Sequence, residues 1–144
     1  MIVYAIKGKY SREYDDFISD CLNHLLPRAP KHDVNIHVRF KKLLKNRANS
    51  GECVGDVGEV TIDLARFREC DDGTMWEFTK TELAANLAHE LVHAKQYILG
   101  EINAVDYTWK SNDFSDCGYY DQPWEIEAYH REVILVKRYW KGDK

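Results

Sequence analysis

The amino-acid sequence predicts an α+β fold in one domain that spans residues 1–144. Short segments that alternate between apolar and polar residues, as half-buried strands do, lie in the first half of the chain, and two long segments with helical periodicity lie in the second half. The chain has 144 residues, of which 44% are apolar and 31% are charged, and this is enough for one hydrophobic core. We therefore expect a small sheet with mixed or antiparallel pairing that is covered by helices.

The beginning of the chain predicts a strand followed by a helix that covers one face of the sheet. Residues 2–6 are alternately β-branched and aromatic, and Gly8 ends this strand. Ser11 can cap a helix that stops before Pro27. The apolar residues that recur at helical spacing in this segment are Tyr14, Phe17, Ile18, Cys21, Leu22 and Leu25.

Three further strands are expected before the second helix. Residues 34–40 alternate strictly, which places His37 on the polar face of its strand. A turn at residues 49–51 precedes a short strand at 52–54, and residues 59–64 alternate again. Because the strand at 59–64 directly precedes the next helix, we expect it at the edge of the sheet, where it could pair with an extended peptide.

The charge of the chain argues against two classes of partner. A net charge of −4 gives no electrostatic reason for a nucleic acid or an anionic membrane as partner, and the basic residues at 41–47 are expected to form a solvated face. No apolar run is long enough to span a bilayer, and the N-terminus lacks the layout of a signal peptide. We therefore expect a cytoplasmic location.

The four cysteines are widely spaced and form no Cys-x-x-Cys pair. Reduced and mostly buried thiols fit this spacing better than a disulfide framework or a cysteine-rich zinc site. The residues are Cys21, Cys53, Cys70 and Cys117. Any metal site must therefore depend on the histidines.

The stretch His89-Glu90-Leu91-Val92-His93 lies inside a well-delimited helix. Thr79 and Glu82 form a capping box that predicts a helix from residue 80 to residue 99, and Gly100 ends it. Two histidines four residues apart lie on the same face of a helix, so both can bind one metal ion.

Glu90 lies between the two histidines, where it can reach a water molecule at the open coordination position of the metal and act as a general base. On a helical wheel, His89 and His93 lie outside the broad apolar face, together with Asn86 and Tyr97. They are therefore expected to border a cleft. The apolar face consists of Leu83, Ala84, Leu87, Ala88, Leu91, Val92, Ala94 and Ile98. Residues 101–121 are expected to form an irregular connection beside the cleft, with a strand or hairpin arm at 105–110.

The last helix offers a third ligand. Asp121 can cap it, Pro123 fits its first turn, and it extends to about Trp140. Glu125 projects from the centre of its apolar stripe, where a carboxylate needs a metal ion or a hydrogen bond at the helix N-terminus as partner. The stripe consists of Ala128, Tyr129, Val133, Leu135, Val136, Tyr139 and Trp140.

Two other glutamates of this helix have different expected roles. Glu127 points away from the apolar stripe and is expected to be exposed to solvent. Glu132 lies near the inward face, where it either accepts a hydrogen bond from a ligand histidine or forms an ion pair at the edge of the core. We expect the ion pair.

The motif His89-Glu90-x-x-His93, followed by Glu125-Ile126-Glu127-Ala128, resembles the gluzincin metallopeptidases, whose third ligand is the first Glu of a Glu-x-x-Ala-like element. The short chain and the string from Pro123 to Tyr129 are similar to the minigluzincins or SprT-like domains of phage and bacteria. The resemblance covers roughly the C-terminal half. It implies a zincin-like fold with one zinc ion bound by His89, His93 and Glu125, with Glu90 catalytic and with a peptide or protein as substrate.

The chain departs from this family in two ways. Some gluzincins carry an Asp one turn after the ligand Glu to orient a histidine, whereas Tyr129 stands at that place here. No motif identifies the residue that donates a hydrogen bond to the transition state. From their expected position beside the cleft, the candidates are Tyr107, Lys110, Tyr119 and Tyr120.

Three functions are compatible with these residues. Zinc-dependent hydrolysis of a peptide bond with Glu90 as general base is preferred. The second is hydrolysis of a non-peptide amide, as in deformylases, which use His-Glu-x-x-His and an upstream cysteine that Cys53 faintly resembles. The third is a zinc-stabilised protein of zincin fold that binds another protein without cleaving it. The sequence does not define the oligomeric state.

Overall fold

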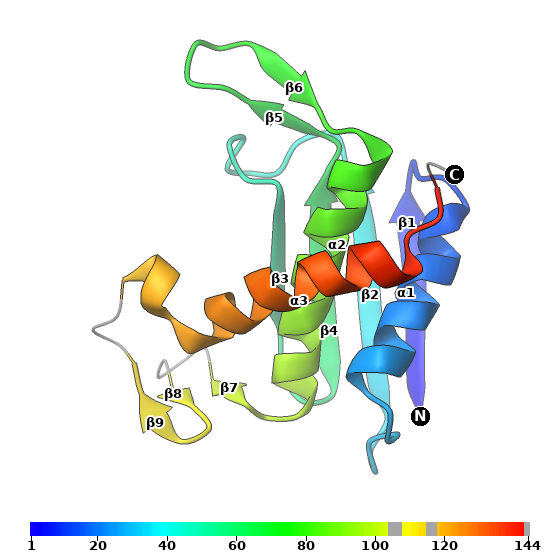
Figure 1. Ribbon diagram of the computed structural model, residues 1–144, viewed down its shortest axis with the longest axis vertical. Coiled ribbons are helices and arrows are strands. Elements are labelled where there is room, and N and C mark those ends of the chain that lie inside the picture. The colour runs from blue at the N-terminus through cyan, green and yellow to red at the C-terminus, as the bar shows by residue number, and fades with distance from the viewer. Residues whose placement is uncertain (104–107, 115–117, 143–144) are drawn as a thin grey trace.

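The computed structural model describes residues 1–103, 108–114 and 118–142, and its helices and small sheets confirm the α+β class (Figure 1). The main sheet has four strands in the order β1-β2-β4-β3. These are β1 (Ile2–Gly8), β2 (Val34–Lys41), β3 (Gly51–Gly55) and β4 (Glu59–Ala65). β1, β2 and β4 are parallel and β3 is antiparallel to β4, so the sheet is mixed.

The edge of the sheet nearest the predicted site is β3, and the expectation that residues 59–64 form an edge is wrong. β4 pairs with β2 on one side and with β3 on the other, and its apolar side chains are fully buried. A tight turn folds β3 back along β4, because Asp56 Oδ1 accepts hydrogen bonds from the backbone N–H groups of Gly58 and Glu59. Alternation alone does not distinguish the outer from the inner strand of such a hairpin.

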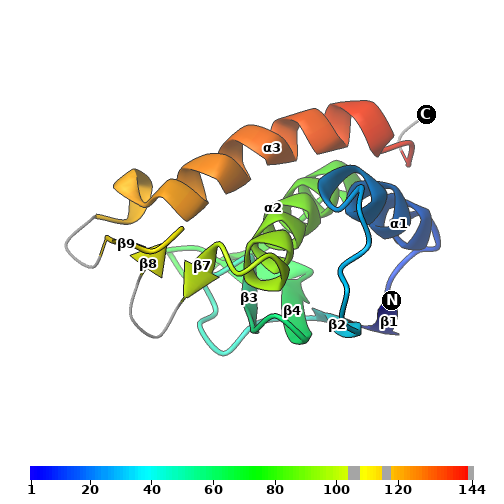
Figure 2. The same ribbon diagram turned by 90° about the horizontal axis from the view of Figure 1, so that it is seen from below.

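Two helices, α1 (Glu13–Leu25) and α2 (Lys80–Ile98), cover one face of the sheet side by side (Figure 2). The apolar residues predicted for α1 are all buried. However, α1 begins after Arg12, with no side-chain capping hydrogen bond, so Ser11 is not its N-cap. His37 lies on the outer, polar side of β2 as expected, and its Nε2 is 3.0 Å from Glu59 Oε1.

The helix α2 begins and ends where the sequence predicts. Thr79 Oγ1 accepts a hydrogen bond from the Glu82 N–H at 3.1 Å, and Glu82 Oε1 accepts one from the Thr79 N–H at 2.9 Å, which completes the capping box. Gly100, with a φ of 69°, ends the helix in a left-handed conformation. Leu87 and Leu91 are completely buried, so α2 is the central helix of the fold.

The last helix, α3 (Pro123–Tyr139), crosses α2 on the side away from the sheet (Figures 1 and 2). Pro123 occupies its first turn as predicted, but the N-cap is Gln122 and makes no side-chain capping hydrogen bond. Asp121 instead ends a short 3-10 helix, η1 (Tyr119–Asp121). The expectation that Asp121 caps α3 is therefore wrong.

The buried face of α3 differs from the predicted apolar stripe. Trp124, Ala128 and Leu135 are buried, whereas Tyr129 is 44% and Val133 is 65% exposed. A helix that lies on top of another helix makes contact along one narrow face only, so part of its apolar surface stays in solvent.

Two smaller sheets flank these layers. The hairpin of β5 (Phe67–Glu69) and β6 (Met75–Glu77) extends beyond the start of α2, with the predicted loop around Gly73 at its tip (Figure 1). A three-stranded sheet of β7 (Ile102–Asn103), β8 (Thr108–Trp109) and β9 (Asn112–Asp113) lies near the start of α3. The strand expected at 105–110 corresponds to β8, and residues 104–107 lie outside the described part of the chain.

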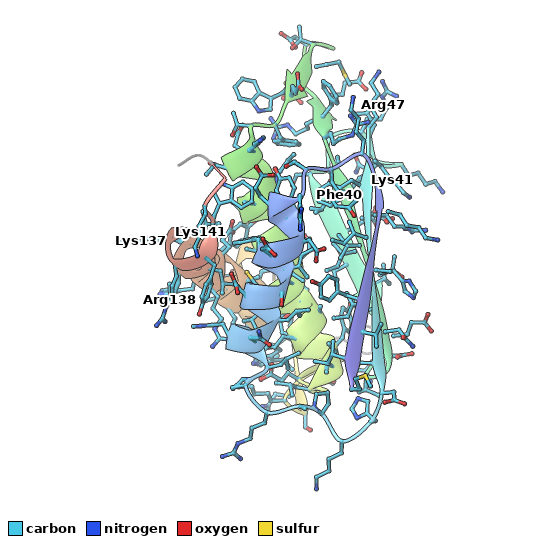
Figure 3. All side chains as sticks on the ribbon, turned by 90° about the vertical axis from the view of Figure 1, so that its right-hand side faces the viewer. Phe40, Lys41, Arg47, Lys137, Arg138 and Lys141 are labelled. Atoms are coloured by element: carbon cyan, nitrogen blue, oxygen red, sulfur yellow. The ribbon has the colours of Figure 1, made fainter. Side chains whose placement is uncertain are left out.

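The basic side chains of residues 41–47 are exposed, as expected. Lys41 pairs with Asp63, and Arg47 pairs with Glu69. Figure 3 places these two basic residues by the sheet and a second basic group on the side of α3, namely Lys137, Arg138 and Lys141. Among the residues that the structure describes, no helix combines the length and apolar character needed to cross a bilayer.

Three of the four cysteines lie in the described ranges, and all three are free thiols. Cys21 is buried, whereas Cys53 and Cys70 are half-buried. Cys117 lies outside the described residues.

Candidate metal centre

The crossing of α2 and α3 brings three metal-ligating side chains to one point. His89 and His93, one turn apart on α2, face Glu125 in the first turn of α3. Glu125 Oε1 is 3.0 Å from His89 Nε2 and 3.2 Å from His93 Nε2, and the two Nε2 atoms are 3.2 Å apart. These three residues form a group that could hold a metal ion.

The other ring nitrogen of each histidine, Nδ1, faces a hydrogen-bond acceptor. Glu132 Oε1 is 3.1 Å from the Nδ1 of His89, and Gln96 Oε1 is 2.8 Å from the Nδ1 of His93. An acceptor at each Nδ1 favours the tautomer in which Nδ1 carries the proton. In a neutral ring the Nε2 atom then directs its lone pair towards the oxygen of Glu125, whereas in a protonated ring Nε2 donates a hydrogen bond to it.

Three electron-pair donors that converge in this way repel one another unless a metal ion or a proton lies between them. In a tetrahedral zinc site with ligands about 2.0–2.1 Å from the ion, neighbouring ligand atoms are about 3.3 Å apart. The three measured separations, 3.0, 3.2 and 3.2 Å, are within a few tenths of an ångström of that value. The donor set therefore fits a divalent metal ion with at least one further coordination position.

Without a metal ion, protons stabilise the same cluster. Burial lowers the pKa of His89, but hydrogen bonds with Glu125 and Glu132 outweigh this effect and raise the pKa to about 9. Burial likewise raises the pKa of Glu125, but hydrogen bonds from His89 and His93 outweigh it and lower the pKa to about 2. At neutral pH the metal-free site is thus an ion pair, and an arriving metal ion must displace a proton.

Glu90 supplies an acid–base group beside this cluster. It is 7% exposed, and burial raises its pKa to about 7 although the positive charges of His93 and His89 act in the opposite direction. A Cβ atom added at Gly51 of β3 would lie 3.1 Å from Glu90 Cγ, so the edge strand closely confines this side chain. A carboxyl group with a pKa near neutrality is suited to accept a proton and to return it.

A cleft of about 610 Å³ contains these groups and lies between the edge strand of the sheet and the beginning of α3. Residues 48–53, from β3 and the turn before it, line one side. The lining from α2, η1 and α3 includes His89, Glu90, His93, Tyr119, Glu125 and Tyr129. The histidines therefore face a cleft, as the helical wheel predicts.

Of the four residues proposed as transition-state donors, Tyr119 lies in the cleft. Its hydroxyl donates a hydrogen bond to Glu125 Oε1 at 3.1 Å and is 3.2 Å from the hydroxyl of Tyr129. The ring of Tyr129 lies 4.5 Å from that of His89. The pKa of Tyr119 is raised, first by burial, so the phenol stays protonated and can donate.

The described residues test one of the other three candidates. Lys110 forms an ion pair with Glu101 at 3.6 Å and lies over the ring of Trp109, and it is not among the described residues that line the cleft. Tyr107 lies outside the described residues, as does the side chain of Tyr120.

Two expectations about the glutamates of α3 are wrong. Glu127 is not a solvent-exposed residue, because Lys95 Nζ donates hydrogen bonds to its two carboxylate oxygens at 2.9 and 2.8 Å and Gln96 donates a third. Glu132 is not an ordinary ion pair at the edge of the core, because it faces the Nδ1 of His89. The error on Glu127 arises because α3 turns a different face to α2 than its apolar stripe indicates. Glu132 was expected near the inward face, and only its partner was wrong.

Gln96 is a site residue that the sequence interpretation missed. It follows His93 by three residues, so both side chains lie on the same side of α2. A fully buried glutamine at this spacing after the second histidine of the motif is the signal that could have identified it.

No protein-family model, curated protein or solved structure matches the chain. The functional interpretation therefore depends on the chemistry of the His89, His93, Glu125 and Glu90 cluster itself.

Proposed function

We propose that this protein is a zinc-dependent metallopeptidase of zincin-like fold, with a single zinc ion at His89, His93 and Glu125. The observation that carries the proposal is the convergence of three ligand atoms at 3.0–3.2 Å beside a buried glutamate in an open cleft. Structural zinc sites usually have four protein ligands, whereas catalytic sites have three and leave one position for water or substrate. A cytoplasmic location is part of the proposal.

Each residue has a defined task in this reaction. The zinc ion would polarise the substrate carbonyl and acidify a water molecule. Glu90 would take the proton from that water and deliver it to the leaving amine, for which a pKa of about 7 is well matched. Tyr119 would donate a hydrogen bond from its hydroxyl to the oxyanion that develops on the substrate, in place of its present hydrogen bond to Glu125.

The edge strand supports a polypeptide as substrate. β3 pairs with β4 along one side, and Gly51 and Cys53 of β3 line the cleft. An extended chain can add to such an edge through backbone hydrogen bonds, which bind a polypeptide without regard to its sequence. This is the role that the sequence interpretation gave to residues 59–64.

Amide hydrolysis of the deformylase type is less well supported. Cys53 lines the cleft, but it does not belong to the three-residue group whose ligand atoms lie within 4.8 Å of one another among the described residues. Burial of an ionisable group costs free energy of folding. A binding protein without turnover would gain nothing from a buried Glu90 with a pKa of about 7, so this residue favours catalysis.

The test combines metal analysis with three variants, two of which are a matched pair of histidine replacements. Wild-type protein is expected to carry one zinc ion per chain, His93→Ala to lose it, and His37→Ala, on the outer face of the sheet, to keep it. Glu90→Gln is expected to keep the zinc ion and to lose more than 99% of its activity on a denatured protein substrate. Absence of bound metal in the wild type, or full activity of Glu90→Gln, would refute the proposal.

A further inference from the structure

Gln96 of α2 forms a fully satisfied set of hydrogen bonds beside the metal centre. Its side chain is completely buried, with a relative exposure of 0%. Its Oε1 is 2.8 Å from the Nδ1 of His93, and its Nε2 donates to the backbone carbonyl of Trp124 and to Glu127 Oε1, both at 2.9 Å. All hydrogens of the amide are therefore in use.

These partners fix the orientation of the amide. Trp124 offers a carbonyl oxygen and Glu127 offers a carboxylate, and both can only accept hydrogen bonds. If the amide were reversed, its oxygen would face two acceptors without a hydrogen between them, which is unfavourable in a buried site. The oxygen of Gln96 must therefore point to His93.

The fixed amide has consequences for two ligands. Because Gln96 Oε1 can only accept, Nδ1 of His93 must donate, and Nε2 of His93 is the nitrogen directed at the cluster. The second contact holds the carbonyl of Trp124, the residue directly before Glu125. One side chain of α2 thus controls the tautomer of one ligand and the backbone position of another.

The third partner is itself held in place. Lys95 is 5% exposed, and its Nζ donates to both oxygens of Glu127 and pairs with Glu101 Oε1 at 2.7 Å. The carboxylate of Glu127 is therefore anchored opposite Gln96, and it cannot rotate away without breaking a buried ion pair.

We propose that Gln96 is a positioning residue of the metal centre, which selects the metal-binding tautomer of His93 and docks the first turn of α3, and with it Glu125, onto α2. This inference depends on the metal centre of the proposed function, but not on the hydrolysis of peptides. A carboxylate at this position would face the Trp124 carbonyl and the Glu127 carboxylate, so a neutral amide is required.

The test compares Gln96→Met with Gln122→Met. Gln122 makes no side-chain capping hydrogen bond, so its variant controls for the chemical change alone. Zinc affinity is measured by competition with a chromophoric chelator, and the state of the histidine rings is read from long-range ¹H–¹⁵N spectra. Gln96→Met is expected to bind zinc about 10–100-fold more weakly and to lose the slowly exchanging Nδ1–H signal of His93, whereas Gln122→Met stays within about twofold of the wild type. An affinity of Gln96→Met within twofold of the wild type would overturn the inference.

A second variant keeps the test decisive if Gln96→Met does not fold. Gln96→Glu preserves the shape of the side chain but removes the two N–H donors, and it is expected to weaken zinc binding by a similar factor. Gln96→Glu combined with Glu127→Gln should recover part of that loss, because one of the two opposing carboxylates is then neutral. Wild-type affinity of Gln96→Glu would contradict the role of the donors. These measurements require no substrate, so a protein that binds zinc but cleaves no peptide would refute the proposed function and leave this inference intact.

Discussion

Replacement of Lys95 by methionine tests the polar network that joins α2 to α3. Lys95 is 5% exposed and neutralises two carboxylates, Glu127 at 2.8 Å and Glu101 at 2.7 Å. Methionine fills similar space but leaves both carboxylates without their cation. Removal of one partner from a buried ion pair typically costs about 3–5 kcal/mol, because the remaining charge is left uncompensated.

The expected magnitude lies at the lower end of that range. The side chains of Glu101 and Glu127 keep 16% and 24% exposure, and Gln96 still donates to Glu127, so part of the lost interaction is replaced by water and by this hydrogen bond. We expect a loss of about 3 kcal/mol. For a urea m-value of about 2 kcal/mol/M, this lowers the midpoint of unfolding by about 1.5 M.

The assay is urea unfolding of the metal-free protein, followed by circular dichroism. Lys80→Met is the matched control, because Lys80 is 52% exposed and is 3.6 Å from Glu13, so its loss should shift the midpoint by less than about 0.25 M. The double variant Lys95→Met with Glu127→Gln should recover part of the loss. A midpoint of Lys95→Met within 0.5 M of the wild type would show that the carboxylates are adequately hydrated and that the network contributes little.

Two further changes test the sheet and its edge. Burial raises the pKa of Asp63, but hydrogen bonds from Arg39 and Lys41 outweigh it and lower the pKa, so the ionised form adds stability above about pH 4 and this contribution disappears as the pH falls through the lowered pKa. Asp63→Asn should therefore lower the free energy of unfolding, measured in urea at pH 7, by about 1 kcal/mol, because the side chains of both cations are nearly half exposed. The difference between variant and wild type should shrink at pH 3, and an equal difference at both pH values would contradict this role of Asp63. Gly51→Ala places a Cβ 3.1 Å from Glu90 Cγ and 3.3 Å from Glu90 Oε2, so the Glu90 carboxylate must shift. We expect kcat to fall about tenfold while zinc stays bound, and an unchanged kcat would show that β3 does not confine Glu90.

The parts of the fold that the sequence predicts well are those set by local interactions. The capping box of Thr79 and Glu82 and the left-handed Gly100 define α2 within one residue, because each signal involves neighbours in the chain. With the helix defined, the four-residue spacing of His89 and His93 is enough to place them together. Glu125 was also identified, since a carboxylate among apolar residues needs a partner.

The parts that were not predicted depend on how elements pack against each other. The helical wheel assumes that the most apolar face of α3 is the buried one, yet Tyr129 and Val133 are exposed and Glu127 is turned towards α2. A few exposed apolar side chains reduce the free energy of unfolding only slightly. By contrast, Lys95 and Gln96 of α2 form directional hydrogen bonds with polar groups of α3. The polar contacts therefore set the rotation of α3. In the same way, no local pattern distinguishes β3 from β4 as the sheet edge.

The two residues that face the Nδ1 atoms of the histidines, Glu132 and Gln96, differ in charge, and their surroundings explain this difference. A divalent ion with Glu125 and ionised Glu90 would form a neutral unit, and Glu132 adds one negative charge beside His89. The side chain of Glu132 keeps 16% exposure and lines the cleft, so water can solvate this charge. Gln96 is fully buried and already faces the carboxylate of Glu127, where a second anion could not be hydrated. The centre therefore has a carboxylate, Glu132, on the side open to the cleft and a neutral amide, Gln96, on the buried side. Replacement of Gln96 by Glu should weaken metal binding far more than replacement of Glu132 by Gln.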